Sequence, residues 1–175
     1  MTARIVSIGT AVPPTRIAQA VSRDIFAAQE GADRLARRRI QAVFDASAIE
    51  QRHTVLAEFA SGPATGPADP AAFVDVEGRL LSPTTGARNQ RYIASAPKLT
   101  AAAARTALAD GGIDPSAVTH VVTVSCTGLF APGPDYHLVR ELGLRPTVER
   151  CHLGFIGCAA ALPALRVASA LAASA

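Results

Sequence analysis

The strongest constraint on the fold is the run at residues 119–125 (THVVTVS), which is rich in β-branched side chains and lacks Asp, Glu, Lys and Arg. Such a run is typical of a strand that is buried on both faces, as in a sheet covered by helices. An alanine-rich segment at 97–110 predicts a helix before it, which Gly111 and Gly112 would end, and residues 114–116 predict a turn. Helix, turn and buried strand are half of a β-α-β unit, so the sequence predicts an α/β fold.

A second stretch, residues 148–166, predicts a short strand, a tight turn, a cysteine and a helix of small residues. Gly157 can adopt backbone angles that are closed to other residues, which allows the turn. Cys158 would then lie ahead of a helix, where the helix dipole and unpaired N–H groups favour the nucleophilic thiolate. The alternative is a buried structural cysteine, because free cysteine is among the most buried residue types. These residues alone leave both interpretations open.

The segment between these two stretches predicts a loop over 126–136 and a helix over about 136–142. Loops at the carboxyl ends of central strands are where α/β proteins hold their sites. Cys126, at the start of this loop, is interpreted as a pocket-lining or buried thiol. Cys151 falls on the predicted strand and is interpreted as core packing.

The N-terminal part of the chain predicts a strand over 3–8 and helices over 17–29 and 33–44. Ser22 and Asp24 are candidate start signals for the first of these helices. The second helix carries four arginines, which form either a solvated face or a cationic patch for a phosphorylated ligand. These are Arg34, Arg37, Arg38 and Arg39. Residues 61–70, rich in glycine and proline, predict a surface loop.

Composition limits the class of protein. Hydrophobic residues make up 49% of the 175 residues and charged residues 18%, which excludes a disordered chain. The net charge of +3 is too small and too dispersed to indicate nucleic-acid binding. Three cysteines without a CxxC pair or a histidine at ligand spacing predict neither a zinc site nor a disulfide framework, which favours a reducing, cytoplasmic location. No segment predicts a signal peptide or a membrane span.

The chain stops inside a helical pattern, without a glycine or a basic last turn. A helix that buries one face needs a neighbour. We therefore expect a truncated protein in which an apolar face formed by Leu162, Leu165 and Leu171 is exposed.

Four ordered segments resemble the type III polyketide synthases, the chalcone synthase-like family of the thiolase superfamily. They are 122–128 (VTVSCTG), 132–136 (PGPDY), 142–146 (LGLRP) and 157–159 (GCA), the last followed by Leu-Arg at 165–166. Their order and spacing match the family, and the likeness extends weakly back to Ile5. The chain is more similar to the bacterial branch than to the plant branch. Cys126 stands where plant members usually have threonine, and residues 159–163 replace a more glycine-rich run.

The resemblance implies a thiolase-like α/β fold of α-β-α-β-α layers with two similar halves, and a homodimer. Residues 1–175 would be the N-terminal half of this domain, with the C-terminal half absent. The implied activity is that of an acyltransferase: Cys158 takes a starter acyl group from coenzyme A as a thioester, and decarboxylated malonyl-CoA attacks it. The extension repeats and the product cyclises. Beyond acyl-CoA and malonyl-CoA as substrates, no cofactor, metal, nucleic acid or membrane partner is implied.

Four further residues match functional positions of the family. Cys126 and Thr127 match residues that line the acyl cavity. Ala131 matches a residue that reaches toward the cavity of the partner subunit. Arg39 matches one of the basic residues that contact the phosphates of coenzyme A.

Two parts of the family pattern are missing. Ala42 and Ala46 stand where the family often has two more basic residues, so Arg37 or Arg38 would have to substitute. The family also needs a histidine and an asparagine from the second half of the fold. None of the four histidines of the chain falls at the matching place: His53, His120, His137 and His152. The chain carries the nucleophile without its partners, and we expect it to be inactive alone.

Two other functions stay open. One is another condensing enzyme of the thiolase superfamily, similar to ketoacyl synthase III, although the loop at 132–136 argues against it. The other is a degenerate, non-enzymatic fragment that dimerises or does nothing. A reading frame that continues beyond codon 175 with a histidine and an asparagine would favour the polyketide synthase, whereas a genuine stop would favour the fragment.

Overall fold

The computed structural model describes residues 3–61, 73–75 and 79–174. The chain forms two compact units: unit 1 comprises residues 1–11 and 89–175, and unit 2 comprises residues 12–88. Apart from its first residue, the loop predicted at 61–70 lies outside the described residues. In the described part of the chain, no helix is long and apolar enough to cross a membrane.

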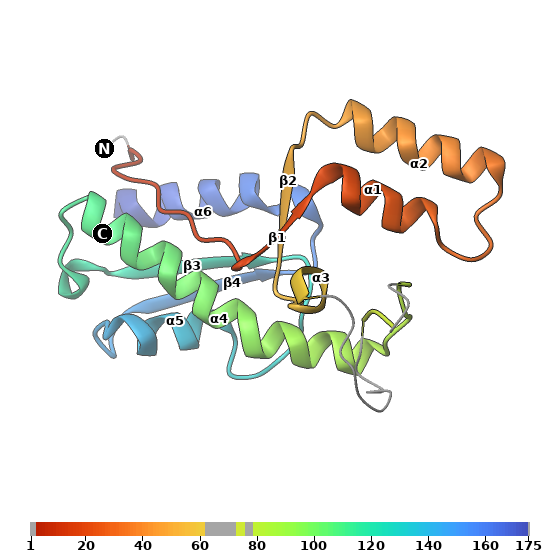
Figure 1. The fold of residues 1–175 in the computed structure, drawn as a ribbon. Helices are drawn as coiled ribbons and strands as arrows, with labels where there is room; N and C mark the ends of the chain where they lie inside the picture. Colours follow the sequence, from red (N-terminus) through yellow and green to blue (C-terminus); the bar gives the residue numbers. More distant parts are fainter. Residues whose placement is uncertain (1–2, 62–72, 76–78, 175) are drawn as a thin grey trace. The chain divides into compact units, whose positions relative to one another are not determined.

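Unit 1 is built on two parallel strands, β3 (His120–Ser125) and β4 (Glu149–Gly154), which pair in register from their first residues to their last. Helix α5 (Pro134–Leu142) connects them and completes a β-α-β unit. The 3-10 turn η2 (Cys158–Ala160) follows β4 and leads into α6 (Ala161–Ser174). Both strands and α5 lie close to the positions predicted for them, and the predicted α/β class is confirmed (Figure 1).

An apolar core closes one face of the strand pair. Val121 of β3 is buried against Leu144 and Val148. Partly buried residues of α5 and of the segment before β3 surround these three: Val118, Leu138, Val139 and Leu142. On the other side α6 packs against β3, so the pair lies between two helices (Figure 1).

The predicted burial of β3 on both faces is right for one face only. Val121 and Thr123 are buried, whereas Val124 is 38% exposed. Side chains alternate along a strand, so Val124 belongs to the opposite face. The described residues cover that face incompletely.

Helix α4 (Thr85–Asp110) begins well before the predicted start at Pro97. Proline lacks an N–H and is usually confined to the first turn of a helix, which is why the sequence favoured a start there. The helix instead runs through Pro97, and Ala101, one turn later, is fully buried. It ends before the two glycines as predicted, and Gly112 has the positive φ of 61° that glycine tolerates. The 3-10 turn η1 (Pro115–Ala117) follows.

The strand predicted over residues 3–8 does not form. The Ser7 hydroxyl donates to the Ala107 carbonyl of α4 at 2.7 Å. Gly9 lies so close to α4 that an added Cβ would be 2.1 Å from the Ala103 carbonyl oxygen. A strand needs a neighbour with free backbone groups, whereas the backbone of a helix is already paired internally. This segment therefore lies along α4 without a ladder.

Unit 2 contains two short antiparallel strands, β1 (Thr15–Ala18) and β2 (Gln51–Thr54). Between them the chain forms α1 (Gln19–Ala27) and α2 (Arg34–Ala46), which lie side by side (Figure 1). The short helix α3 (Glu58–Ser61) follows β2.

The helix predicted over 17–29 begins later than expected. Ile17 pairs with Arg52 in the sheet, and Ser22 and Asp24 lie inside α1 rather than at its start. The pairing partner is distant in the sequence, so a local pattern could not indicate it. The second helix agrees with its prediction: the Asp33 side chain caps α2 by accepting a hydrogen bond from the N–H of residue 36 at 2.7 Å.

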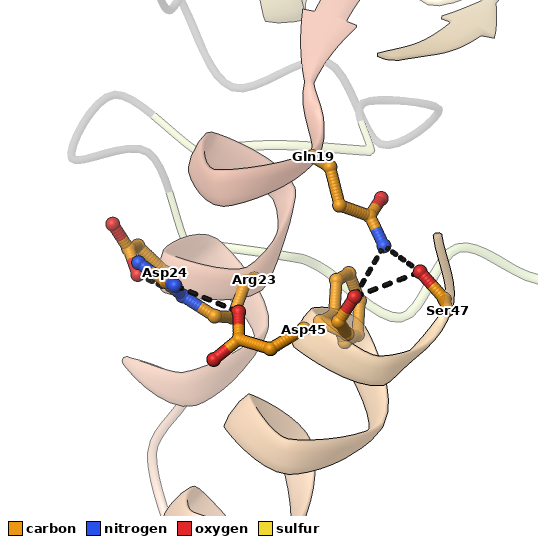
Figure 2. A network of polar contacts seen from close by, with 6 residues as sticks. Gln19, Arg23, Asp24, Asp45 and Ser47 are labelled. Atoms are coloured by element: carbon orange, nitrogen blue, oxygen red, sulfur yellow. Dashed lines mark hydrogen bonds and ion pairs between the residues drawn. The ribbon is translucent and has the colours of Figure 1, made fainter. Parts of the chain in front are cut away.

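Gln19 links α1 to the end of α2 and to β2. Its side chain is 8% exposed, and its Nε2 donates to the Phe44 carbonyl oxygen at 3.1 Å and to Ser47 Oγ at 2.7 Å (Figure 2). Its Oε1 accepts a hydrogen bond from Arg52 Nε at 2.7 Å. One buried amide thus connects α1 to two other elements, α2 and β2.

Replacing Gln19 with leucine should destabilise unit 2, because Phe44, Ser47 and Arg52 each lose one hydrogen bond to this buried amide. Such a hydrogen bond typically contributes about 0.5–1.5 kcal/mol, so we expect a loss of about 1–3 kcal/mol in total. Urea unfolding followed by circular dichroism measures the loss. Gln51→Leu is the matched control, because Gln51 is an exposed residue bonded to Arg16, and its removal should change stability by less than about 0.5 kcal/mol. Equal losses in the two variants would contradict this role of Gln19.

Candidate functional site

Cys158 lies in the turn between β4 and α6. The N–H of Phe155 still donates to the Ser125 carbonyl at 3.1 Å, so the pairing with β3 continues one residue past Gly154, the end of β4. Cys158 then opens η2, and α6 begins at Ala161. The predicted placement of Cys158 at a strand-to-helix turn is confirmed. Its side chain is exposed, so the alternative of a buried structural cysteine is wrong.

Two residues with positive φ shape this turn. Gly157 has φ of 88° and ψ of 175°, a region that is essentially restricted to glycine. Phe155 has φ of 60° although it carries a bulky side chain, which costs of order 1–3 kcal/mol. The residue is 59% exposed, so burial does not compensate this cost, and the backbone bond to β3 holds the residue in place. The turn therefore presents Cys158 from a defined, partly strained backbone.

Cys126 is the first residue after β3. Parallel neighbouring strands end at the same edge of a sheet, so the residues that follow β3 and β4 lie close together. Cys158 lies near enough to raise the pKa of the Cys126 thiol, and both cysteines are free and exposed. Of the two interpretations of Cys126, the buried thiol is wrong, and the pocket-lining thiol stays a prediction.

The pKa of the Cys126 thiol is raised above its ordinary value. Partial desolvation is the largest cause, and the hydrogen bond to Cys158 and the repulsion by the Cys158 thiolate add to it. A raised pKa keeps Cys126 protonated at neutral pH. Its S–H is then available as a donor to the Cys158 sulfur.

The loop that carries Cys126 and Thr127 is fastened to α4 by Tyr92. The Tyr92 hydroxyl donates to Ser125 Oγ at 2.7 Å, and Ser125 Oγ donates to the Thr127 carbonyl oxygen at 2.5 Å. Gly128 lies directly against the same ring, where an added Cβ would be 2.0 Å from Tyr92 Cδ1. Gly128 also has φ of 81°, so both contact and backbone angle require glycine here.

Asn89 holds the next part of this loop. Its Nδ2 donates to the Leu129 carbonyl oxygen and its Oδ1 accepts from the Leu129 N–H, both at 2.7 Å. Ala131, two residues further, is exposed. The two α4 residues thus determine the path of the chain from the end of β3 to Ala131.

Sequence reasoning missed Asn89 and Tyr92 because it placed the start of the helix at Pro97. The run from 85 to 96 contains no glycine after residue 86 and no proline, which is compatible with a helix that continues through Pro97. That pattern could have indicated the longer helix. It could not have indicated which of its residues contact the loop.

Each histidine has a contact of its own away from the thiols. His152 of β4 pairs across the strands with Thr123, at 2.8 Å between Nδ1 and Oγ1, and is exposed. His53 contacts the Pro13 carbonyl, His120 contacts Glu149, and His137 contacts the ring of Phe130. Cys151 lies on β4 and is half-buried, as predicted for core packing.

Arg39 lies on α2 in unit 2 and is exposed. Of its neighbours, Arg37 donates from Nε to the Ala32 carbonyl at 2.9 Å, which occupies part of its guanidinium. Ala42 and Ala46 are exposed on the same helix. Arg38 is therefore the neighbour better placed to supply a second cation.

The apolar face of α6 is exposed at its start and partly covered later. Leu162 and Leu165 are 64% and 55% exposed, as predicted. Leu171 is half-buried, which contradicts the prediction. In this part of the helix Ala168 lines an apolar hollow together with Val122 of β3, so the helix is packed against the strand.

Among the described residues, no group of three or more His, Cys, Asp or Glu side chains could hold a metal ion. The arrangement at the ends of β3 and β4 is instead one of thiols, backbone turns and a fastened loop. Such an arrangement suits nucleophilic chemistry by a thiolate.

Comparison with known proteins connects this arrangement to a family. The chain matches the family described as chalcone and stilbene synthases, N-terminal domain, over residues 1–175.

Three solved structures show the same fold at 26% sequence identity. The first is PKS-I from the brown alga Ectocarpus siliculosus, with a TM-score of 0.79 over 95% of this chain. The second is the C-terminal type III polyketide synthase domain of Steely1, a type I/III hybrid from Dictyostelium, with a TM-score of 0.78 over 100% of this chain. The third is a type III pentaketide synthase from Neurospora crassa, with a TM-score of 0.72 over 95% of this chain. The chain spans less than half of each, namely 43%, 45% and 40% of their lengths.

Replacing Cys158 with alanine should lower the pKa of the Cys126 thiol, because the hydrogen bond and the charge that raise it are removed while the desolvation remains. A lower pKa gives more thiolate at a given pH. The rate of Cys126 alkylation by iodoacetamide, followed by peptide mapping over a pH series, should therefore rise at lower pH in the variant. Cys151→Ser should leave the profile unchanged, and an unshifted profile in Cys158→Ala would contradict the contact between the thiols.

Proposed function

The chain belongs to the chalcone and stilbene synthase family, as its N-terminal domain over residues 1–175, and on that basis we propose that it works in a type III polyketide synthase as the part that accepts the starter acyl group. Cys158 carries the proposal: it is an exposed thiol on a glycine turn between β4 and α6. The similar solved proteins from Dictyostelium and Neurospora crassa are type III polyketide synthases, which supports the same reaction class.

The chemistry of a thiolate suits this reaction. Cys158 attacks the carbonyl carbon of an acyl-CoA, the coenzyme A thiolate leaves, and the acyl group is held as a thioester. A thiolate is also a good leaving group, so the acyl group can be passed to a second nucleophile. In the proposed reaction this nucleophile is the carbanion formed when malonyl-CoA loses carbon dioxide. The new carbon–carbon bond releases Cys158.

We assign the neighbouring residues by the same logic. Cys126 and Thr127 lie at the end of β3 beside Cys158, where they would line the cavity for the acyl chain. Ala131 is exposed further along the same loop, where it would reach toward the cavity of a partner subunit. Arg39, exposed on α2, would contact the phosphates of coenzyme A.

The condensation step needs groups that this chain does not carry at the matching positions. In the family a histidine and an asparagine stabilise the enolate formed by decarboxylation. The four histidines of the chain make other contacts. We propose that residues 1–175 form the N-terminal half of a thiolase-like domain and that the second half supplies these groups.

The family uses acyl-CoA and malonyl-CoA, and its members are typically dimeric. We propose the same substrates and a homodimer for the complete protein, without a cofactor or a nucleic-acid or membrane partner. A cytoplasmic location accords with its three free cysteines.

Incubation with an acyl-CoA should add one acyl group to Cys158, because thioester exchange requires only the thiolate and the bound thioester. Mass spectrometry of the intact protein and of its peptides measures the adduct. A protein limited to residues 1–175 should nevertheless release no polyketide from radiolabelled malonyl-CoA. The donors that stabilise the enolate typically contribute a factor of about 10²–10³ each, and they are missing.

Two variants serve as controls for this experiment. Cys158→Ala should lose the adduct, and Cys151→Ala should retain it. Acylation of Cys126 or Cys151 in place of Cys158 would overturn the assignment of the nucleophile. Polyketide formation above the Cys158→Ala background would show that the second half of the fold is not needed.

Replacing Arg39 with alanine should weaken the binding of coenzyme A about tenfold. A hydrogen bond to a charged group contributes about 1.5–3 kcal/mol, and a factor of ten corresponds to about 1.4 kcal/mol. Isothermal titration with coenzyme A measures the dissociation constant. Arg34→Ala removes the same charge from the same helix and is the matched control. If both variants weaken binding equally, the helix acts only as a general cationic surface and the specific role of Arg39 is wrong.

A further inference from the structure

Two of the three thiols of this chain lie together at one edge of unit 1. Cys126 follows β3 and Cys158 follows β4, and these strands are parallel neighbours whose last residues, Ser125 and Gly154, pair directly. The hydrogen bond from the Phe155 N–H to the Ser125 carbonyl continues the pairing toward Cys158. Both cysteines are free and exposed, and Cys158 lies near enough to Cys126 to raise the pKa of its thiol. The proposed reaction needs one nucleophilic thiol, so Cys126 is not required as a nucleophile.

Residues of α4 hold the chain both before and after Cys126. Tyr92 anchors Ser125, the residue before Cys126, and Ser125 in turn binds the carbonyl of Thr127, the residue after it. Asn89 fixes Leu129 through two hydrogen bonds of 2.7 Å. A thiol on such a loop spends most of its time near its neighbour, which raises its effective concentration there.

We propose that Cys126 and Cys158 form a reversible disulfide when hydrogen peroxide oxidises Cys158. Cys126 is then the resolving cysteine, which attacks the oxidised Cys158. The bond needs the sulfurs to approach to about 2 Å, and both side chains are exposed, so packing does not fix them apart. The disulfide itself does not depend on the proposed function. Only its consequence does: it would remove the thiol that accepts the acyl group.

The reaction balances with hydrogen peroxide as the oxidant. The Cys158 thiolate attacks one peroxide oxygen, hydroxide leaves, and Cys158 becomes a sulfenic acid. The Cys126 sulfur then attacks the Cys158 sulfur, the S–O bond breaks and a second hydroxide leaves. With the two thiol protons, the hydroxides give two molecules of water. Two molecules of a thiol such as glutathione reduce the disulfide and are themselves oxidised to one glutathione disulfide.

The electrostatics of the pair support this order of events. While Cys158 is a thiolate, its charge raises the pKa of the Cys126 thiol and keeps that thiol protonated. Conversion of Cys158 to a neutral sulfenic acid removes the charge. The pKa of Cys126 then falls, although desolvation still raises it, so the thiolate fraction of Cys126 increases.

A variant with two thiols makes the test unambiguous. Cys151 is half-buried on β4, where it pairs with Val122, and Cys151→Ser leaves only Cys126 and Cys158. This variant is treated with one equivalent of hydrogen peroxide, blocked with iodoacetamide and digested without reductant. The expected product is an intramolecular cross-link between the peptides that contain residues 126 and 158, which dithiothreitol reverses. Sulfinic acid on Cys158 without a cross-link, or cross-links between molecules only, would overturn the proposal.

The anchoring of the loop gives a second, graded test. Tyr92→Phe removes the hydroxyl that binds Ser125, a hydrogen bond that typically contributes about 1 kcal/mol. The equilibrium constant for disulfide formation in a glutathione buffer should fall about fivefold. Tyr136→Phe, at the only other tyrosine, is the matched control and should leave the constant unchanged. An unchanged constant in Tyr92→Phe would show that the loop does not position Cys126.

These measurements need no substrate, so they separate this proposal from the proposed function. A cross-link without acylation of Cys158 would support the redox site and refute the acyl-accepting role. Acylation of Cys158 without a cross-link would refute the redox site and support the acyl-accepting role.

Discussion

The parallel pairing of β3 with β4 is the interaction on which the site depends. Its register places Ser125 opposite Gly154, so both strands end at one edge and the residues that follow them emerge together. Cys126 directly follows β3, and Cys158 follows the end of β4 by four residues. This pair of strands is therefore the regular structure that positions both cysteines. A shift of one residue in the register would turn every side chain of a strand to its other face. It would therefore separate the thiols and also remove Val121 from the core.

The second constraint is the close approach of α4 to the loop after β3. Gly128 allows it, because any side chain there would overlap the Tyr92 ring. Two hydrogen-bonding residues one turn apart on the helix, Asn89 and Tyr92, then bind successive parts of the loop. The site is thus assembled from two strand ends and one helix face. Cys158 comes from one strand end, Cys126 from the other, and α4 contributes no group to the reaction but fixes the loop.

The sequence predicted those elements of the fold that depend on residues close to them in the chain. β-branched residues indicated β3, paired glycines ended α4, and Gly157 indicated the turn before Cys158. The parts it missed depend on distant partners. Ile17 joins a strand only because β2 lies beside it, and residues 3–8 fail to form one because they lie along a helix. The contact between the two thiols belongs to the same class, since only the register of the strands creates it.

The exposure of Cys158 has two chemical consequences that follow from one cause. In the proposed reaction the Cys158 thiol has to be accessible to an acyl-CoA, and an accessible thiol can also be reached by peroxide. A threonine at position 126 could hydrogen-bond to the Cys158 sulfur, but its hydroxyl could not attack a sulfenic acid to form a disulfide. Over-oxidation of the nucleophile would then proceed to the irreversible sulfinic acid. A cysteine at this position keeps the hydrogen bond and adds a route back to the free thiol, so the residue in contact with the nucleophile determines whether its oxidation is reversible.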